Sequence, residues 1–343
     1  MSKKRILVIG STGTMGRYLV PELVDLGYEV TGISLDTPKQ PVPVVTYYKG
    51  NCYDLEFLQP FLAQKFDGIV NFMTFPKKYP FANYYKHFLD NTNHYIFLSS
   101  CRVYADEEWP GKETSPRLVD VSKDQELLAS YDYCMHKARA EDLLWSSGYD
   151  NFTIVRPATT FSESMFKLVT LEAPHTIGRA IKGKKVVLPI QAKDKPATLC
   201  WGGDVAKMIA RLMFKPETMK EAYNVCSSEY HTWGEIAEFF EKLCGLQAVW
   251  VDKEDYLRIK SPTSPEISNA SRWQLEYARL FHRITDNTKM LNVTGLKQED
   301  FVTLFDALEK MVKSVPDGHI FPESDDDKII NAQMDAYLEE NKL

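Results

Sequence analysis

The chain lacks the features that mark several common classes of protein. Its 343 residues include only six cysteines, and none of them forms a C-x-x-C pair. We therefore expect reduced thiols, with no disulfide scaffold and no metal site. No apolar run is long enough to cross a membrane, and the run at 6–9 stops at Gly10, too early for a signal peptide.

Positive charge is also scarce. The sequence has 41 basic against 47 acidic residues, and its net charge at pH 7 is −6. This balance argues against binding of nucleic acid or of an anionic membrane surface by the protein as a whole. We expect a cytoplasmic protein, a monomer or a homodimer, whose partner is a small-molecule substrate.

The first half of the chain instead contains a regular alternation of short apolar runs and helical patterns. The runs predict strands at 5–9, 29–33, 44–48, 68–72, 95–99 and 152–156, and the helical patterns lie at 15–26, 55–64 and 130–148. Alternation of this kind indicates βαβ units with right-handed crossovers. The expected fold class is α/β, a Rossmann-type doubly wound parallel sheet whose ligand crevice lies at the carboxyl ends of the strands.

The second half is less regular. It predicts helices at 176–182, 204–214, 232–243 and 299–314, and strands at 185–189, 222–225 and 249–251. We expect one domain over 1–160, a small C-terminal α+β lobe over 161–314 that is interleaved with the core sheet, and a tail over 315–343. The tail predicts an amphipathic helix from Ser324, which either docks on its own domain or forms a dimer contact.

A glycine-rich turn follows the first predicted strand and opens the first helix. Gly10 permits the tight turn, Gly13 lets the backbone approach a pyrophosphate, and Gly16 lets helix and strand pack closely. The helix N-terminus offers free N–H groups and a partial positive charge to the anion. The expected main-chain contacts come from Gly10, Ser11, Thr12, Gly13, Thr14, Met15 and Gly16.

Two further motifs carry acid/base chemistry. Tyr133 and Lys137 are four residues apart on a predicted helix, so they share a face, and a lysine ammonium beside a phenol lowers the pKa of that phenol. Such a pair also occurs by chance on solvated helix faces. Ser100 ends a predicted strand, where its hydroxyl can donate to a substrate oxygen or simply cap the strand end.

In their order and spacing, the three motifs resemble the short-chain dehydrogenase/reductase superfamily, in its extended and atypical branches that include the NAD-dependent epimerase/dehydratase family. The likeness covers residues 5–310 and includes Tyr104, Arg156-Pro157, Gly203-Asp204-Val-Ala206 and Tyr223-Asn224-Val225.

The resemblance implies that Tyr133 is the general acid/base and Lys137 its electrostatic partner, which also holds the nicotinamide ribose. Ser100 would orient the reacting oxygen. Further cofactor contacts are implied for Phe72, Met73, Thr74 and Pro157.

The resemblance implies that the domain over 1–160 binds NAD or NADP and that the lobe over 161–314 binds the substrate. An acidic residue at the end of the second strand normally selects NAD, but Ser34 stands there, where a contact with the cofactor is expected, and Asp36 follows two residues later. No basic residue follows at once to bind a 2′-phosphate, although Arg17 could reach one. Asn51 replaces the acidic residue that the family often carries near adenine, and its amide can still hydrogen-bond the adenine edge.

Two departures from the family narrow the expected function. The segment between Phe72 and Tyr95 is too short for the long helix that forms the usual dimer interface. Arg102 follows Ser100-Cys101 where sugar-nucleotide dehydratases carry an acidic pair, which makes dehydration less expected than epimerisation or reduction.

Candidate substrate contacts are Arg102, Arg179 and Trp201, although an ion pair explains Arg179 equally well. His136 is interpreted as structural. The expected function is an NAD(P)-dependent epimerase or reductase that acts on a nucleotide-sugar or a related hydroxy or keto substrate by Tyr-assisted hydride transfer. Two alternatives stay open: an NADPH-dependent reductase of a non-sugar carbonyl compound, and a catalytically silent dinucleotide-binding regulatory protein.

Overall fold

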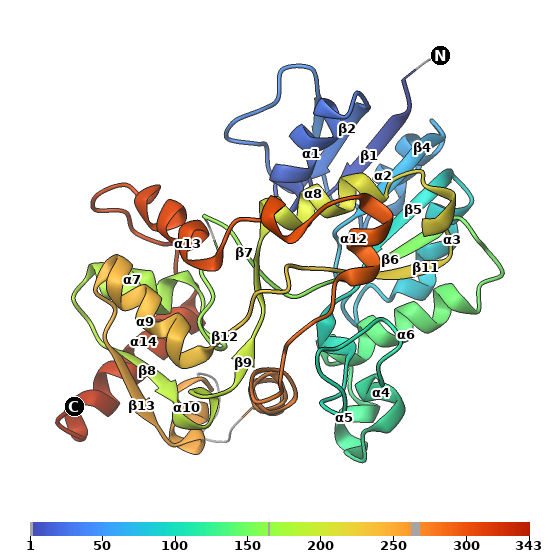
Figure 1. Cartoon of the computed structure of the whole chain (residues 1–343). Coiled ribbons are helices and arrows are strands. Elements are labelled where there is room, and N and C mark those ends of the chain that lie inside the picture. The colour runs from blue at the N-terminus through green and yellow to red at the C-terminus, as the bar shows by residue number, and fades with distance from the viewer. Residues whose placement is uncertain (1–2, 164, 262–267) are drawn as a thin grey trace. The chain divides into compact units, whose positions relative to one another are not determined.

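The structure, a computed structural model, describes residues 3–163, 165–261 and 268–343 (Figure 1). The chain forms two compact units, each built from separated segments. The first unit comprises Met1–Thr160, Cys200–Ser228 and Thr285–Phe301, and the second comprises Phe161–Leu199, Glu229–Ile284 and Val302–Leu343. Residues 200–228 and 285–301, which the sequence assigns to a C-terminal lobe interleaved with the core sheet, belong to the first unit.

The first unit is built on a seven-stranded sheet in which every pairing is parallel, and this confirms the expected fold class. The strand order is β11-β6-β5-β4-β1-β2-β3. The strands are β1 (Arg5–Ile9), β2 (Glu29–Ser34), β3 (Thr46–Lys49), β4 (Phe66–Asn71), β5 (Thr92–Leu98), β6 (Phe152–Pro157) and β11 (Glu221–Val225). Because the winding reverses between β1 and β4, the carboxyl ends of these two strands mark the expected ligand crevice.

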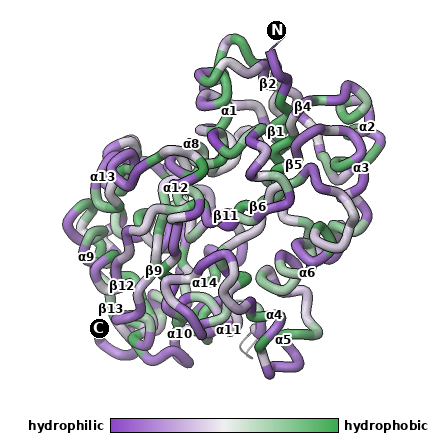
Figure 2. The backbone as a smooth tube through the Cα atoms, turned by 45° about the vertical axis from the view of Figure 1, so that its right-hand side comes forward, coloured by the Kyte–Doolittle hydropathy of each residue, from purple (hydrophilic) through white to green (hydrophobic). Residues whose placement is uncertain are grey.

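Helices cover both faces of this sheet, as doubly wound folds require. Alternate residues of β1 enter different cores: Ile6 and Val8 pack with α1 and α8, whereas Leu7 and Ile9 pack with α2, α3 and α6. Figure 2 shows the hydrophobic residues along this buried strand. The helices of this unit are α1 (Gly16–Asp25), α2 (Leu55–Leu62), α3 (Tyr85–Leu89), α4 (Leu118–Val121), α5 (Gln125–Ala129), α6 (Tyr133–Trp145), α8 (Gly202–Leu212) and α12 (Thr288–Thr294).

Helix α6 begins three residues later than its apolar pattern predicts. Asp132 is the N-cap, and its carboxylate accepts the backbone N–H of Cys134 at 3.1 Å. A capping aspartate satisfies an N–H that the helix cannot bond internally, so it determines where the helix starts. The first helical residue is therefore Tyr133.

The second unit has two small sheets and several helices. Its strands β8 (Val186–Pro189) and β13 (Ala248–Val251) pair in parallel, and β9 (Pro196–Ala197) and β12 (His231–Thr232) pair antiparallel. Its helices are α7 (Ile177–Ile181), α9 (Trp233–Cys244), α10 (Lys253–Ile259), α11 (Asn269–Gln274), α13 (Leu304–Lys313) and α14 (Asp325–Glu340). Strands β7 (Thr159–Phe161) and β10 (Leu199–Trp201) lie where the chain passes between the units.

The tail helix α14 packs within the second unit. Ser324 caps it in a reciprocal arrangement with Asp327, as the sequence predicts. Its apolar stripe of Ile330, Met334 and Leu338 is buried. Of the two roles left open for this stripe, the structure shows docking on the protein's own fold. In the part of the chain that the structure describes, no helix is long and apolar enough to cross a membrane.

Candidate active site

The glycine turn folds tightly between β1 and α1. Gly10 has φ +84°, and a Cβ atom there would lie 3.1 Å from the Cβ of Phe72. A Cβ at Gly16 would lie 2.1 Å from the carbonyl oxygen of Gly10. Since real Cβ atoms do not approach oxygen so closely, only glycine allows α1 to start against the end of β1.

Gly13 differs from Gly10 and Gly16 because it is exposed. A Cβ atom at Gly13 would meet only the Gly10 oxygen, at 3.3 Å. Helix α1 begins three residues later. An open backbone beside a helix N-terminus is the arrangement that binds phosphate in dinucleotide folds. The residues present therefore fit the pyrophosphate of a dinucleotide.

Ser100 and Tyr133 meet at the carboxyl edge of the same sheet. Ser100 follows β5, is buried, and accepts the backbone N–H of Arg102 at 3.2 Å. Tyr133, half-buried at the first position of α6, lies beside Ser100, whose side chain is close enough to influence its pKa. Burial raises the pKa of Tyr133, while the charge of Arg102 and the side chain of Ser100 lower it. The structure thus brings together the predicted acid/base, Tyr133, and the serine predicted to orient the reacting oxygen.

Lys137 lies one turn further along α6 and is completely buried. Its Nζ donates to the backbone oxygens of Leu98 (2.5 Å) and Met73 (3.4 Å), and lies 5.7 Å from the centroid of the Tyr133 ring. Burial lowers the pKa of Lys137 to about 7, although the charge of Glu141 opposes that shift. The ammonium therefore stands near the tyrosine but is held by main-chain carbonyls.

Comparison with known proteins identifies the family. Residues 6–226, well over half of the chain, match the model of the NAD-dependent epimerase/dehydratase family. The chain belongs to this family. The expectation of a nicotinamide dinucleotide cofactor is confirmed, since the family is NAD-dependent. No curated protein sequence matches the chain.

Solved structures agree on the fold. An epimerase from Methanothermobacter thermautotrophicus is 15% identical, with a TM-score of 0.69, and the match covers 91% of this chain and 92% of that one. A UDP-glucose 4-epimerase from Thermotoga maritima, solved with UDP-glucose, is 16% identical (TM-score 0.67; 90% and 97% covered). A dTDP-glucose 4,6-dehydratase from Bacillus anthracis, in complex with NAD, is 18% identical (TM-score 0.66; 90% and 96% covered). These likenesses show the shared fold.

The end of β2 is arranged differently from the sequence-based expectation. Ser34 is buried beneath the glycine turn, where its hydroxyl accepts the backbone N–H of Thr12 at 3.0 Å and lies 3.2 Å from the hydroxyl of Ser11. Ser34 therefore supports the turn from its buried side. Asp36, two residues later, is exposed, and its carboxylate accepts the Thr12 hydroxyl. The carboxylate of Asp36, two residues past the position expected for it, thus still contacts the glycine turn.

The remaining residues predicted to contact the cofactor lie around the same edge. Phe72 continues β4 and donates its N–H to the carbonyl of Ile9 at 3.0 Å, and the Met73 carbonyl is the one that accepts from Lys137. Thr74 is exposed, with its hydroxyl 3.5 Å from that of Tyr53. Asn51 is exposed after β3, whereas Pro157 is the buried last residue of β6. These segments all follow strands of one parallel sheet, so they share its carboxyl edge.

The three predicted substrate contacts have different surroundings. Arg102 lies beside Tyr133, with Cζ 5.3 Å from the ring centroid. Trp201 packs edge-on against Tyr18 of α1, with centroids 5.0 Å apart. Arg179 belongs to the second unit, is buried, and donates to Asp335 of α14 at 2.7 Å. For Arg179 the structure therefore supports the ion-pair alternative.

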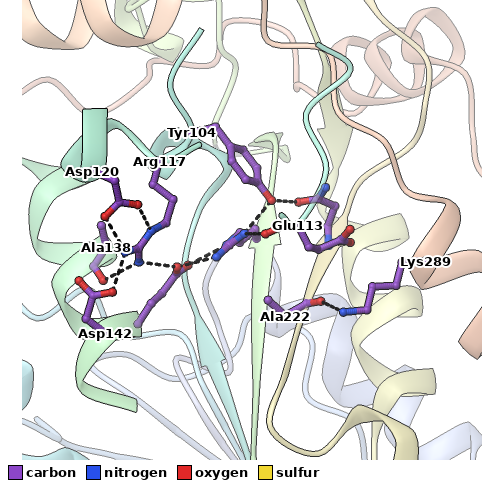
Figure 3. Close-up of polar contacts among 11 residues, drawn as sticks. Tyr104, Glu113, Arg117, Asp120, Ala138, Asp142, Ala222 and Lys289 are labelled. Atoms are coloured by element: carbon purple, nitrogen blue, oxygen red, sulfur yellow. Dashed lines mark hydrogen bonds and ion pairs between the residues drawn. The ribbon is translucent and has the colours of Figure 1, made fainter. Parts of the chain in front are cut away.

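A buried polar network connects β6 and β11 with α6, which it reaches through the contact of Arg156 with Glu141 (Figure 3). The Tyr104 hydroxyl accepts from Arg156 at 2.9 Å and donates to Asn224 at 2.7 Å. The backbone N–H of Asn224 donates to the Glu113 carboxylate at 2.8 Å. Three of the further family motifs, those at Tyr104, Arg156 and Asn224, thus meet in one place and have a structural role.

Sequence reasoning missed two supporting residues. Asp132 is signalled by its place just before a helix, and its carboxylate lies 3.2 Å from the Arg102 guanidinium. Gly202 gives no such signal: a Cβ there would lie 2.3 Å from the Thr14 oxygen, so α8 starts directly against the glycine turn. His136, interpreted as structural, packs edge-on against Tyr133 with centroids 5.4 Å apart.

Proposed function

We propose that the protein is an NAD-dependent epimerase or reductase of the short-chain dehydrogenase type, with Tyr133 as its general acid/base. The observation that carries this proposal is that Ser100 and Tyr133 lie side by side at the carboxyl edge of the sheet, with the Lys137 ammonium 5.7 Å from the centroid of the tyrosine ring. A phenol and a serine hydroxyl in this arrangement can both reach a substrate oxygen placed between them.

The dinucleotide would be held by the main chain of the glycine turn at its pyrophosphate and by Phe72–Thr74 and Pro157 near the nicotinamide. Lys137 would hold the nicotinamide ribose. Open backbone at Gly13 supports this placement, because it has room for phosphate oxygens. When bound, the nicotinamide supplies a group that accepts a hydride from carbon and returns it.

The chain's own residues handle the proton. Tyr133, as phenolate, removes a proton from a substrate hydroxyl, and the Ser100 hydroxyl donates to the same oxygen as it becomes a carbonyl. In an epimerase the keto form turns, is reduced on its other face, and recovers its proton from Tyr133. In a reductase the path runs once in reverse, with Tyr133 as the proton donor.

A nucleotide-sugar is the substrate class that we favour. Structures of the same fold were solved with UDP-glucose and with UDP-glucuronic acid. Arg102 stands where dehydratases carry an acidic residue, and a guanidinium cannot act as an acid/base near neutral pH. Epimerisation or reduction is therefore favoured over dehydration.

The test begins with native mass spectrometry of freshly purified protein, which detects any retained dinucleotide and its phosphate state. The protein is then incubated with UDP-glucose and catalytic NAD, and NMR follows the appearance of the 4-epimer. Tyr133→Phe should lower turnover by roughly 10²- to 10⁴-fold with dinucleotide affinity unchanged. Tyr230→Phe, at an exposed tyrosine of the second unit, is the matched control.

Each outcome separates the alternatives. Full activity in Tyr133→Phe rules out the mechanism. Stoichiometric oxidation of NADPH by a ketone, with no epimer formed, identifies a reductase of a non-sugar carbonyl compound. Dinucleotide binding without turnover across nucleotide-sugars and ketones identifies a regulatory binding protein.

A further inference from the structure

Building on the proposed function, we propose that Arg102, held by Asp132, is the cation that stabilises the phenolate of Tyr133 and holds its ring in place. Arg102 would then be a positioning residue that acts through the tyrosine. Lys137, to which the resemblance assigns this role, would chiefly hold the cofactor ribose.

The guanidinium lies against the face of the tyrosine ring. Its Cζ is 5.3 Å from the ring centroid, and Nη2 is 3.2 Å from a carboxylate oxygen of Asp132. Only 12% of the Arg102 side chain and 7% of the Asp132 side chain are exposed. A cation this close to an aromatic ring, and this well shielded from water, interacts more strongly with the ring than an exposed one does.

The ion pair also joins the two segments that carry the reacting oxygens. The backbone N–H of Arg102 donates to Ser100 at 3.2 Å, and Asp132 directly precedes Tyr133 while it caps α6. Arg102 and Asp132 are 30 residues apart in the chain. Their pairing therefore fixes Ser100 relative to Tyr133 through short, rigid connections on both sides.

Lys137 lies almost as near the ring, with Nζ 5.7 Å from its centroid, but it is engaged elsewhere. Its Nζ donates hydrogen bonds to two backbone carbonyls, and burial lowers the pKa of the ammonium to about 7. An arginine stays charged throughout the working pH range. In keeping with this, the charge of Arg102 lowers the pKa of Tyr133.

The other titratable groups around the ring do not replace Arg102. From the turn after β5, Cys101 opposes ionisation of Tyr133. From α6, burial and the charge of Lys137 lower the pKa of His136 to about 4, so its edge-on imidazole is neutral. The carboxylate of Asp132 pairs with Arg102. The guanidinium, 5.3 Å from the ring centroid, is thus the nearer of the two cations beside the ring.

A direct titration tests this. Protein labelled with ¹³C at tyrosine Cζ is followed by NMR from pH 6 upward, and Tyr133→Phe identifies the Tyr133 signal among the 18 tyrosines. Arg102→Gln should raise the pKa of Tyr133 by about 1–3 units, and Arg102→Lys should recover at least half of that shift. Lys137→Met should shift it less than Arg102→Gln does. Arg258→Gln, at an exposed arginine of α10, should leave it unchanged.

An unchanged Tyr133 signal in folded Arg102→Gln overturns the proposal, as does a larger shift in Lys137→Met. Near-UV circular dichroism checks folding. If Arg102→Gln does not fold, Lys137→Met still decides: a shift of one unit or more there overturns the proposal, and a smaller one supports it. The titration needs no turnover, so failure of the proposed enzymatic function would be seen separately. In active enzyme, the acidic limb of the kcat/KM profile should move with the Tyr133 signal.

Discussion

Arg156 and Glu141 form a two-armed ion pair inside the first unit, with Nε–Oε1 at 2.9 Å and Nη2–Oε2 at 2.7 Å. Glu141 is fully buried on α6, and Arg156 is nearly so on β6. A second arginine, Arg117, approaches the same carboxylate at 3.5 Å (Figure 3). The pair fastens the helix of Tyr133 and Lys137 to the sheet at a distance from the reacting groups.

Removing one partner of this pair should destabilise the fold strongly. Glu141→Gln leaves the Arg156 charge buried without its counter-charge, and we expect a loss of about 3–5 kcal/mol in the free energy of unfolding. Urea denaturation measures it. Glu309→Gln, which breaks the exposed pair with Lys313 on α13, should cost at most about 0.5 kcal/mol. Equal effects of the two variants would show that burial does not strengthen the pair.

Substitutions at two glycines of the turn should have different effects, at Gly16 on stability and at Gly13 on dinucleotide binding. Gly16→Ala forces a Cβ into the Gly10 oxygen and should lower the free energy of unfolding by more than about 2 kcal/mol. Gly13→Val adds its side chain to the exposed side, so it should leave stability within about 1 kcal/mol but weaken dinucleotide binding at least tenfold. Urea denaturation and calorimetric titration with NAD separate the two effects. Unchanged NAD affinity in Gly13→Val would exclude this turn as the pyrophosphate site.

The sheet of the first unit was predictable because its signals are local. Buried parallel strands leave continuous apolar runs, and the glycine turn lies wholly within residues 10–16. Strands β9 and β12 are two residues long and leave no periodicity to detect. Helix α10 is missed because the polar run Lys253–Asp255 opens it. Residues 200–228 belong to the first unit because α8 packs against α1, and this contact between distant segments leaves no local pattern in the sequence.

The candidate site divides in the same way. Ser100, Tyr133 and Lys137 could be found because their spacing within short elements is characteristic. The contacts that tune them could not: the carbonyl that holds Lys137 is 39 residues away, and Arg102 and Asp132 are 30 apart. For Arg179 the sequence left a substrate contact and an ion pair open, because its partner, Asp335, follows 156 residues later. The sequence alone does not show which charged residue will pair with which when the partners are far apart in the chain.

His94 predicts a loss of stability in mild acid. It is fully buried, its Nδ1 accepts the backbone N–H of Phe214 at 2.9 Å, and its Nε2 therefore carries the proton toward Thr153 at 2.8 Å. Burial, aided by the charge of Lys4, lowers the pKa of His94 to about 4. The unfolded chain thus binds more protons between pH 6.5 and 4, so the free energy of unfolding falls as the pH drops through this window.

The His94 contribution from pH 7 to 5 should be about 2 kcal/mol. In His94→Gln the loss over this range should be smaller by that amount, while His136, whose pKa is also lowered to about 4, maintains the remainder. Urea denaturation at both pH values measures it. An Nδ1 resonance of His94 that titrates near pH 6.5 in the folded protein would contradict the prediction.

Asp36 predicts a preference for NAD over NADP. Its carboxylate accepts the Thr12 hydroxyl at the glycine turn, where it would accept from ribose hydroxyls and repel a 2′-phosphate. Asp36→Asn should therefore tighten NADP binding by about tenfold with little effect on NAD, as measured by calorimetric titration. Asp25→Asn makes the same charge change at the other end of α1 and should leave the NAD to NADP ratio unchanged. Wild-type protein that binds both dinucleotides equally, through the guanidinium of Arg17 beside Thr12, would show that the basic residue outweighs the acidic one.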